Sequence, residues 1–137
     1  MGTPTGLHPL KRTLDVATPA VAQGATDSAV IGRAPFTGVV SAARFTPKAA
    51  IAGADTNTRR VSIVNRGQGG AGAAEVAARQ FNAGVNGVAF DEGDLTLSAT
   101  AANLNVAAGD VLEFRSAAVG TGIADPGGSI TVELTRD

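Results

Sequence analysis

The sequence contains no cysteine, no tryptophan and no tyrosine, and its single histidine is His8. Without cysteine there is neither a disulfide framework nor a thiolate metal site, and His8 has no second histidine or cysteine with which to form the common nucleophile–base pairs. No apolar run is long enough to span a membrane, and the first residues lack the charged-then-apolar pattern of a signal peptide. We therefore expect no enzyme activity, no cofactor, no metal centre and no membrane partner.

The sequence also has little net charge, because 11 basic and 12 acidic side chains give −1 over 137 residues. Such a chain has no overall electrostatic attraction to nucleic acid, and its length is that of one ordinary domain. Alanine, glycine and arginine are abundant instead, and their GC-rich codons indicate a genome of high GC content. With only five phenylalanines, the core must consist mainly of Val, Ile, Leu and Ala.

Apolar and polar residues alternate repeatedly from Ser28 onwards. In one such run Ile130, Val132 and Leu134 alternate with threonine and glutamate, which is the period of a strand with one buried face. The same alternation predicts strands in residues 39–45, 60–65, 87–90, 94–98 and 110–116. Segments rich in Gly, Asn and Asp predict turns at 53–57, 91–94, 107–110 and 125–128. The sequence therefore predicts an all-β fold, an antiparallel β-sandwich or jelly roll, over residues 28–137.

The inward faces of these strands predict the core. Its expected members are Val39, Phe45, Val61, Ile63, Leu95, Leu97, Leu112, Phe114, Ile130, Val132 and Leu134. The run 87–90 is expected to point Val88 and Phe90 to one side. Residues 73–81 are ambiguous, because their alanines favour a helix whereas the surrounding strands favour a strand; we predict a strand.

Residues 1–27 are predicted to form an extended N-terminal arm. Pro4, Pro9 and Pro19 interrupt the segment, and it buries too little apolar surface to offset its own ordering entropy. We expect the arm to be disordered in the free protein and to order on a partner, either in shallow pockets or as a strand added to a sheet edge. The residues expected to contact the partner are Leu7, Leu10, Lys11, Arg12, Leu14 and Val16.

Three short motifs have a functional and a simpler interpretation. Residues 67–72 match the GxGxxG pattern of dinucleotide sites, but a Rossmann unit needs strand–helix crossovers, so we predict a flexible glycine loop. Asp91, Glu92 and Asp94 could bind a hard cation such as calcium, but we favour a solvated turn. The pair Arg59–Arg60 could meet acidic groups of a partner, and we interpret it as solvated charge.

Two parts of the sequence resemble small head-decoration proteins of tailed bacteriophages of high-GC hosts. They are residues 46–67, TPKAAIAGADTNTR followed by VSIVNRG, and residues 106–128, which include VAAGDVL and VGTGIADPGG. The resemblance covers roughly residues 35–136. It implies a β-sandwich, homotrimers at three-fold or quasi-three-fold capsid positions, and the major capsid protein as partner.

The resemblance therefore predicts a structural virion protein that binds the outer surface of a phage capsid and stabilises it. A tail or fibre module is an alternative that composition does not separate from it. A carbohydrate-binding module is the alternative from another class, and the absence of Trp and Tyr, on which sugar platforms usually rely, disfavours it.

Overall fold

The computed structural model describes residues 10–136, which contain strands and one 3₁₀ turn but no α-helix. The elements follow in the order β1 (Lys11–Thr18), β2 (Asp27–Arg33), β3 (Gly38–Pro47), β4 (Thr58–Gly67), β5 (Ala74–Gln80), β6 (Gly93–Asp94), β7 (Thr96–Leu97), η1 (Ala101–Leu104), β8 (Asn105–Val106), β9 (Val111–Val119) and β10 (Gly128–Arg136). None of these residues forms a helix that is long and apolar enough to cross a membrane.

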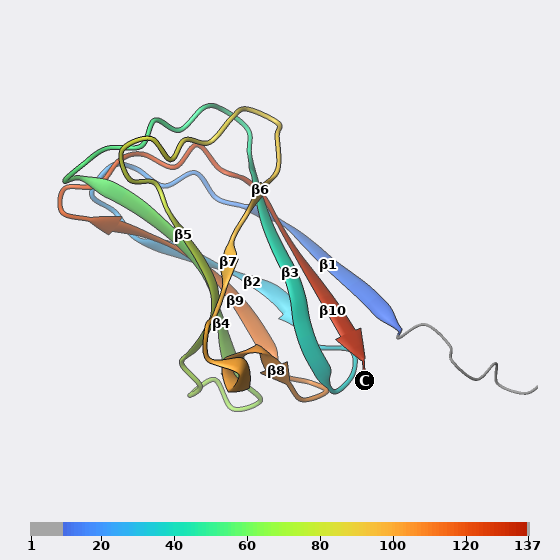
Figure 1. The fold of residues 1–137 in the computed structure, drawn as a ribbon. Helices are drawn as coiled ribbons and strands as arrows, with labels where there is room; N and C mark the ends of the chain where they lie inside the picture. The colour runs from blue at the N-terminus through green and yellow to red at the C-terminus, as the bar shows by residue number, and fades with distance from the viewer. Residues whose placement is uncertain (1–9, 137) are drawn as a thin grey trace, which may run out of the picture.

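The strands form two antiparallel sheets (Figure 1). Sheet 1 has the order β1-β10-β3, with β6 and β8 both paired to β3, and sheet 2 has the order β2-β9-β4-β5-β7. The two sheets face each other across one apolar core, because the buried side chains of both belong to a single cluster. The all-β prediction is therefore confirmed, and the arrangement is sandwich-like.

Three phenylalanines lie at the centre of the core. The ring of Phe45 stacks on that of Phe114, with centroids 5.7 Å apart, and meets the edge of Phe81 at 6.5 Å. These contacts join β3 of sheet 1 to β9 and the end of β5 in sheet 2. Nine of the eleven predicted core residues are buried, and Leu97 is partly buried against the same cluster.

Val39 is the predicted core residue that the structure contradicts. It is only half-buried, whereas Val40 is 1% exposed. The register along β10 explains the exchange: Ala42 pairs with Glu133, but the next residue of β10, Leu134, pairs with Val40. Ser41 is therefore an extra residue in β3, a β-bulge that reverses the alternation of inward and outward side chains. Counting back from Phe45 in steps of two residues therefore places Val39 on the inward face, which is incorrect.

The other strand predictions had different outcomes. Residues 74–80 form strand β5, so the preference for a strand over a helix is confirmed. The strand predicted at residues 87–90 is wrong, because these residues lie in the loop between β5 and β6. In that loop Val88 is 59% and Phe90 80% exposed.

The predicted boundary between arm and domain is also wrong. Strand β1 pairs with β10 from Lys11↔Thr135 to Thr18↔Gly128, so it is a strand of sheet 1 and residues 10–27 belong to the two-sheet body. The partner strand is the last in the chain, and the pairing satisfies backbone groups that an isolated arm would expose to water. Residues 1–9, including Leu7 and His8, lie outside the described residues.

Candidate functional site

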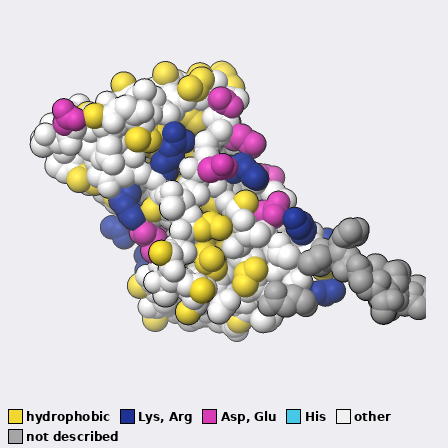
Figure 2. All heavy atoms as spheres, viewed as in Figure 1, with side chains coloured by type: hydrophobic (Ala, Val, Ile, Leu, Met, Phe, Trp, Pro, Cys, Tyr) yellow, Lys and Arg dark blue, Asp and Glu magenta, His cyan; other side chains and the backbone are white. Residues whose placement is uncertain are grey.

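Four loops meet at one end of the two sheets, the upper end in Figure 1. They comprise residues 19–26, 48–57, 82–92 and 120–127, and we call this part of the molecule the Arg59 end. Figure 2 shows apolar side chains gathered over it. The exposed apolar residues of two of these loops are Ala49, Ala50, Ala52, Ala83, Val88, Ala89 and Phe90.

Arg59 ties two of these loops together from inside the protein. It lies on β4 with the inward parity of Val61, and its side chain is fully buried. Its guanidinium donates to three backbone carbonyls: Nε to Ile123 at 2.8 Å, one terminal nitrogen to Ala25 at 2.8 Å and the other to Ala22 at 3.0 Å.

The interpretation of Arg59–Arg60 as solvated charge is therefore wrong for Arg59. Burial lowers the pKa of Arg59, and the negative charge of Asp125 partly offsets that effect. Arginine stays protonated even when it is buried, because its ordinary pKa is far above neutral pH. Arg60 points to the opposite face and donates to both carboxylate oxygens of Glu75, at 2.5 and 2.6 Å.

Asp125 fixes the turn that precedes β10. Its buried carboxylate accepts hydrogen bonds from Ser116 Oγ at 2.7 Å and from the backbone N–H of Gly127 at 2.8 Å. Its own backbone forms two hydrogen bonds with Val21, at 2.8 and 2.9 Å. The carbonyl of Gly127 in turn accepts from the N–H of Lys48 at 2.8 Å. These contacts hold three chain segments in fixed positions beside one another.

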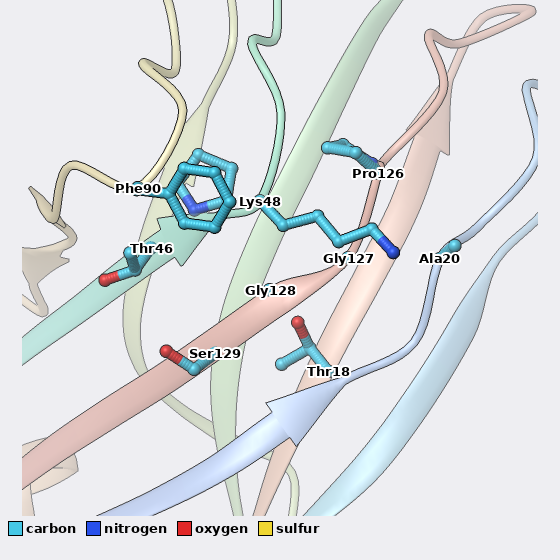
Figure 3. A pocket seen from close by; sticks show the side chains of 10 residues that line it. Thr18, Ala20, Thr46, Lys48, Phe90, Pro126, Gly127, Gly128 and Ser129 are labelled. Atoms are coloured by element: carbon cyan, nitrogen blue, oxygen red, sulfur yellow. The ribbon is translucent and has the colours of Figure 1, made fainter.

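A cleft of about 350 Å³ opens where these segments meet (Figure 3). It lies between the end of β1, the start of β10, the end of β3 and the loop that carries Phe90. Its volume is at the lower end of the range of small-ligand sites, about 300–1,000 Å³. The residues that line it are Thr18, Ala20, Thr46, Pro47, Lys48, Phe90, Pro126, Gly127, Gly128 and Ser129.

Thr18 brings an unsatisfied hydroxyl to this cleft. The residue is 8% exposed, and its Oγ1 is buried and has no hydrogen-bond partner among the described residues. In Figure 3 the hydroxyl points from the end of β1 towards Gly128, into the cleft. A buried polar group without a partner costs about 1–3 kcal/mol, so the hydroxyl is a feature that the fold alone does not explain.

Phe90 adds a second unfavourable feature at the rim. It is 80% exposed and has a φ of 60°, the left-handed region that bulky residues rarely adopt. Its N–H donates to the carbonyl of Pro47 at 2.8 Å, which ties the turn to the end of β3. Left-handed backbone at a non-glycine residue costs about 1–2 kcal/mol, and the ring gains no burial in return.

Lys48 supplies the charge of the cleft. It is exposed, and none of the ion pairs among residues 10–136 includes it. In Figure 3 its side chain extends across the cleft past Gly127. The cleft therefore combines an apolar wall, one ammonium group and one buried hydroxyl, which is the chemistry of a binding site.

The predicted partner-binding residues lie elsewhere, on and next to β1. Leu10, Leu14 and Val16 pack against the core of their own sheets, so these apolar side chains are occupied within the chain. Lys11 and Arg12 are exposed, and Lys11 Nζ lies 3.6 Å from a carboxylate oxygen of Glu133. Leu7 is outside the described residues.

The remaining motifs do not form a site. Residues 67–72 lie in the hairpin loop between the antiparallel strands β4 and β5, so the strand–helix context of a dinucleotide site is missing there. Two carboxylates of the acidic turn face an arginine of β3: Arg44 Nε lies 3.2 Å from Asp94 Oδ1 and 3.8 Å from Glu92 Oε1. Within the part of the chain that the structure describes, no cluster of side chains could hold a metal ion.

Sequence reasoning did not identify the cleft residues. The sequence pattern places Thr18 in the arm and Phe90 in a strand, and nothing in the pattern marks Lys48 as a binding residue. Arg59 was detectable, because the parity of Val61 and Ile63 on β4 places it on the inward face. Comparison with known proteins adds no assignment: no protein-family model, no curated protein and no solved structure matches the chain.

Proposed function

We propose that the chain is a structural virion protein that binds the outer surface of a phage capsid and stabilises it, with the major capsid protein as its partner. The observation that carries the proposal is where one half of each decoration-protein-like segment lies. Residues 46–59 and 119–128 are far apart in the sequence, yet both belong to the Arg59 end.

Hydrogen bonds join these two segments directly. Arg59 donates to the carbonyl of Ile123, and the N–H of Thr121 donates to Asn57 Oδ1 at 3.0 Å. The N–H of Lys48 donates to Gly127, as described above. Some of the similar residues, 46–59 and 119–128, thus build one cross-linked surface at the Arg59 end, and this surface is our candidate for docking. The other similar residues, 61–67 and 106–112, lie along β4 and β9 towards the opposite end.

Self-association and the exact fold are part of the same proposal. A homotrimer needs an interface of at least about 1,000 Å² between specific partners. The proposal does not require a trimer in solution, because neighbouring copies on the capsid raise the effective concentration. The jelly-roll form of the sandwich likewise stays a prediction.

The test is decoration of capsids. Undecorated capsids assembled from the major capsid protein of the same genome are mixed with the purified chain, and bound copies are counted by cryo-electron microscopy. We expect binding to saturate at the number of three-fold and quasi-three-fold positions, with contacts between copies. A few copies at one vertex would favour a tail or fibre module, and no binding at a large excess of chain would overturn the proposal.

A further inference from the structure

The cleft at the Arg59 end has three features that residues 10–136 leave without partners. They are the buried Thr18 hydroxyl, the exposed ring of Phe90 on left-handed backbone, and the Lys48 ammonium group. Each is unfavourable or unused by itself, and strained or unsatisfied groups concentrate at binding sites because a ligand offsets their cost. We infer that the cleft binds a short extended peptide segment of another protein, in which an apolar side chain is followed two residues later by a carboxylate, so that both side chains lie on the same face of the segment.

The apolar side chain fits the wall at Phe90. The turn of the ring is held at Pro47, and the ring is 80% exposed in the isolated chain. Covering it with an aliphatic or proline side chain removes both surfaces from water. The hydrogen bond from Phe90 N–H to Pro47 fixes the turn before a ligand arrives, so little ordering is needed on binding.

The carboxylate fits Lys48. This ammonium group has no acidic partner among the described residues, and in Figure 3 it reaches over the glycine floor of the cleft. A single lysine matches one negative charge. Phosphate-rich ligands such as nucleic acids are bound by several basic groups, and Lys48 is the only basic residue in the lining.

The hydroxyl of Thr18 fits the backbone of the segment. It can donate one hydrogen bond and accept others. The oxygen is covered in the free chain, so part of the cleft wall must shift before a peptide carbonyl or N–H can bond to it. The floor beside it consists of Gly127 and Gly128, whose backbone packs closely against Thr18 and Thr46 of the same chain. A sugar is disfavoured because the lining offers no Trp or Tyr face, on which sugar platforms usually rely.

This inference goes beyond the proposed function, because it does not require that the partner be a capsid. It is tested on the full chain, labelled with ¹⁵N, by titration with the blocked tetrapeptide Ac-Leu-Ala-Asp-Ala-NH₂ and its Asn counterpart. We expect saturable shifts of the amide signals of Thr18, Lys48, Phe90, Gly127 and Gly128. The Asn peptide should bind about two- to fivefold more weakly, because an exposed ion pair contributes little more than that.

Variants separate the three contacts. Lys48→Ala should abolish the preference for the Asp peptide, whereas Lys11→Ala, which changes the only other lysine of the sequence, should preserve it. Thr18→Val should weaken both peptides and at the same time raise the melting temperature, because it removes a buried hydroxyl that has no partner. Phe90→Ala should weaken both peptides more than Val88→Ala, its exposed neighbour in the same loop.

Three results would overturn the inference. The first is an absence of saturable shifts at the cleft, and the second is binding that neither Lys48→Ala nor Thr18→Val changes. The third is saturable binding of glucose or N-acetylglucosamine at the same signals without a response to either peptide, which would make the cleft a sugar site. A failure here leaves the capsid-decoration test unaffected, because that test counts bound copies on assembled particles.

Discussion

The two ends of the molecule hold their loops together by different means. At the Arg59 end, one buried guanidinium donates to three carbonyls on two loops. The opposite end comprises residues 34–37, 68–73 and 107–110, and we call it the Asp110 end. There, short polar side chains nearer the surface connect the loops. Asp110 accepts from the N–H of Ala107 at 2.8 Å and from Asn65 at 3.0 Å, and Gln68 donates to the carbonyl of Ala108 at 3.1 Å.

The difference lies in what replaces a lost contact. Water reaches the bonds of the Asp110 end, so a broken hydrogen bond there is exchanged for one to solvent at small net cost. Water does not reach the fully buried Arg59, so its loss leaves several carbonyls unsatisfied at once. A single substitution at the Arg59 end should therefore cost much of the stability at once, whereas single substitutions at the Asp110 end should each cost little.

Replacing Arg59 should give the largest effect. In Arg59→Met the side chain still fills space, but the carbonyls of Ala22, Ala25 and Ile123 lose their donors. We expect a loss of at least about 3 kcal/mol in the free energy of unfolding, because each buried carbonyl left without a donor costs about 1–3 kcal/mol. This is a large part of a typical stability of about 5–15 kcal/mol, and urea unfolding followed by circular dichroism measures it.

Arg60→Met is the matched control, one residue away on the same strand. The ion pair of Arg60 with Glu75 is about one-third exposed on both sides, at 35% and 42%. Its loss should cost no more than about 1 kcal/mol. Equal losses in the two variants would show that the buried contacts of Arg59 have no special weight.

A glycine pair gives an intermediate effect. Gly127 at the Arg59 end and Gly70 in the loop between β4 and β5 both have a φ of +82°, so an alanine at either position pays about 1–2 kcal/mol for left-handed backbone. A Cβ at Gly127 would lie only 3.0 Å from backbone atoms of Thr18 and Ala20, whereas nothing lies within 4 Å at Gly70.

We expect Gly127→Ala to cost about 1–3 kcal/mol more than Gly70→Ala, because close-packed backbone must move to accept the methyl group. Thermal unfolding of both variants measures the difference. Similar melting temperatures would mean that the Arg59 end is as loosely packed as the glycine loop, and the contrast between the ends would be lost.

The smallest effect concerns acid sensitivity at Asp110. The hydrogen bond from Ala107 N–H, with a second from Asn65, holds the pKa of Asp110 below its ordinary value. A pKa that is lower in the folded state stabilises the protein above the unfolded-state value of about 3.9, and this contribution is lost as the pH falls below it. Asp110→Asn should therefore make stability depend less on pH in this acid range.

Unfolding in urea at pH 7 and pH 3 measures that dependence. Some acid sensitivity should remain in Asp110→Asn, because the pKa of Glu75 is also lowered, chiefly by its hydrogen bonds from Arg60. An unchanged difference between the two pH values would show that Asp110 contributes nothing measurable.

Strands β9 and β10 could be predicted from sequence because nothing interrupts their alternation. Ile130, Val132 and Leu134 on β10 are all fully buried as expected. The prediction failed at β3, where the bulge at Ser41 changes the face of every residue before it. A bulge is set by pairing with β10, a strand far away in sequence, so the local pattern of β3 contains no sign of it.

The N-terminal strand and the cleft were hidden for a related reason. Leu14 and Val16 alone give β1 a short apolar period, and Pro9 and Pro19 suggested an arm when in fact they flank a strand. Which hydroxyl remains unsatisfied, or which phenylalanine adopts left-handed backbone, depends on how four loops pack together. No period or motif in the sequence encodes that packing.

The pairing of β1 with β10 also constrains how the protein is made. Strand β10 lies between β1 and β3, and its register joins Lys11 to Thr135. A ribosome that has reached Gly127 has produced both neighbours of β10 but not the strand that holds them together. Sheet 1 can therefore close only after β10 has been made, and contacts so distant in sequence form slowly. Until then the nascent chain exposes two unpaired strand edges, which are open to pairing with other chains.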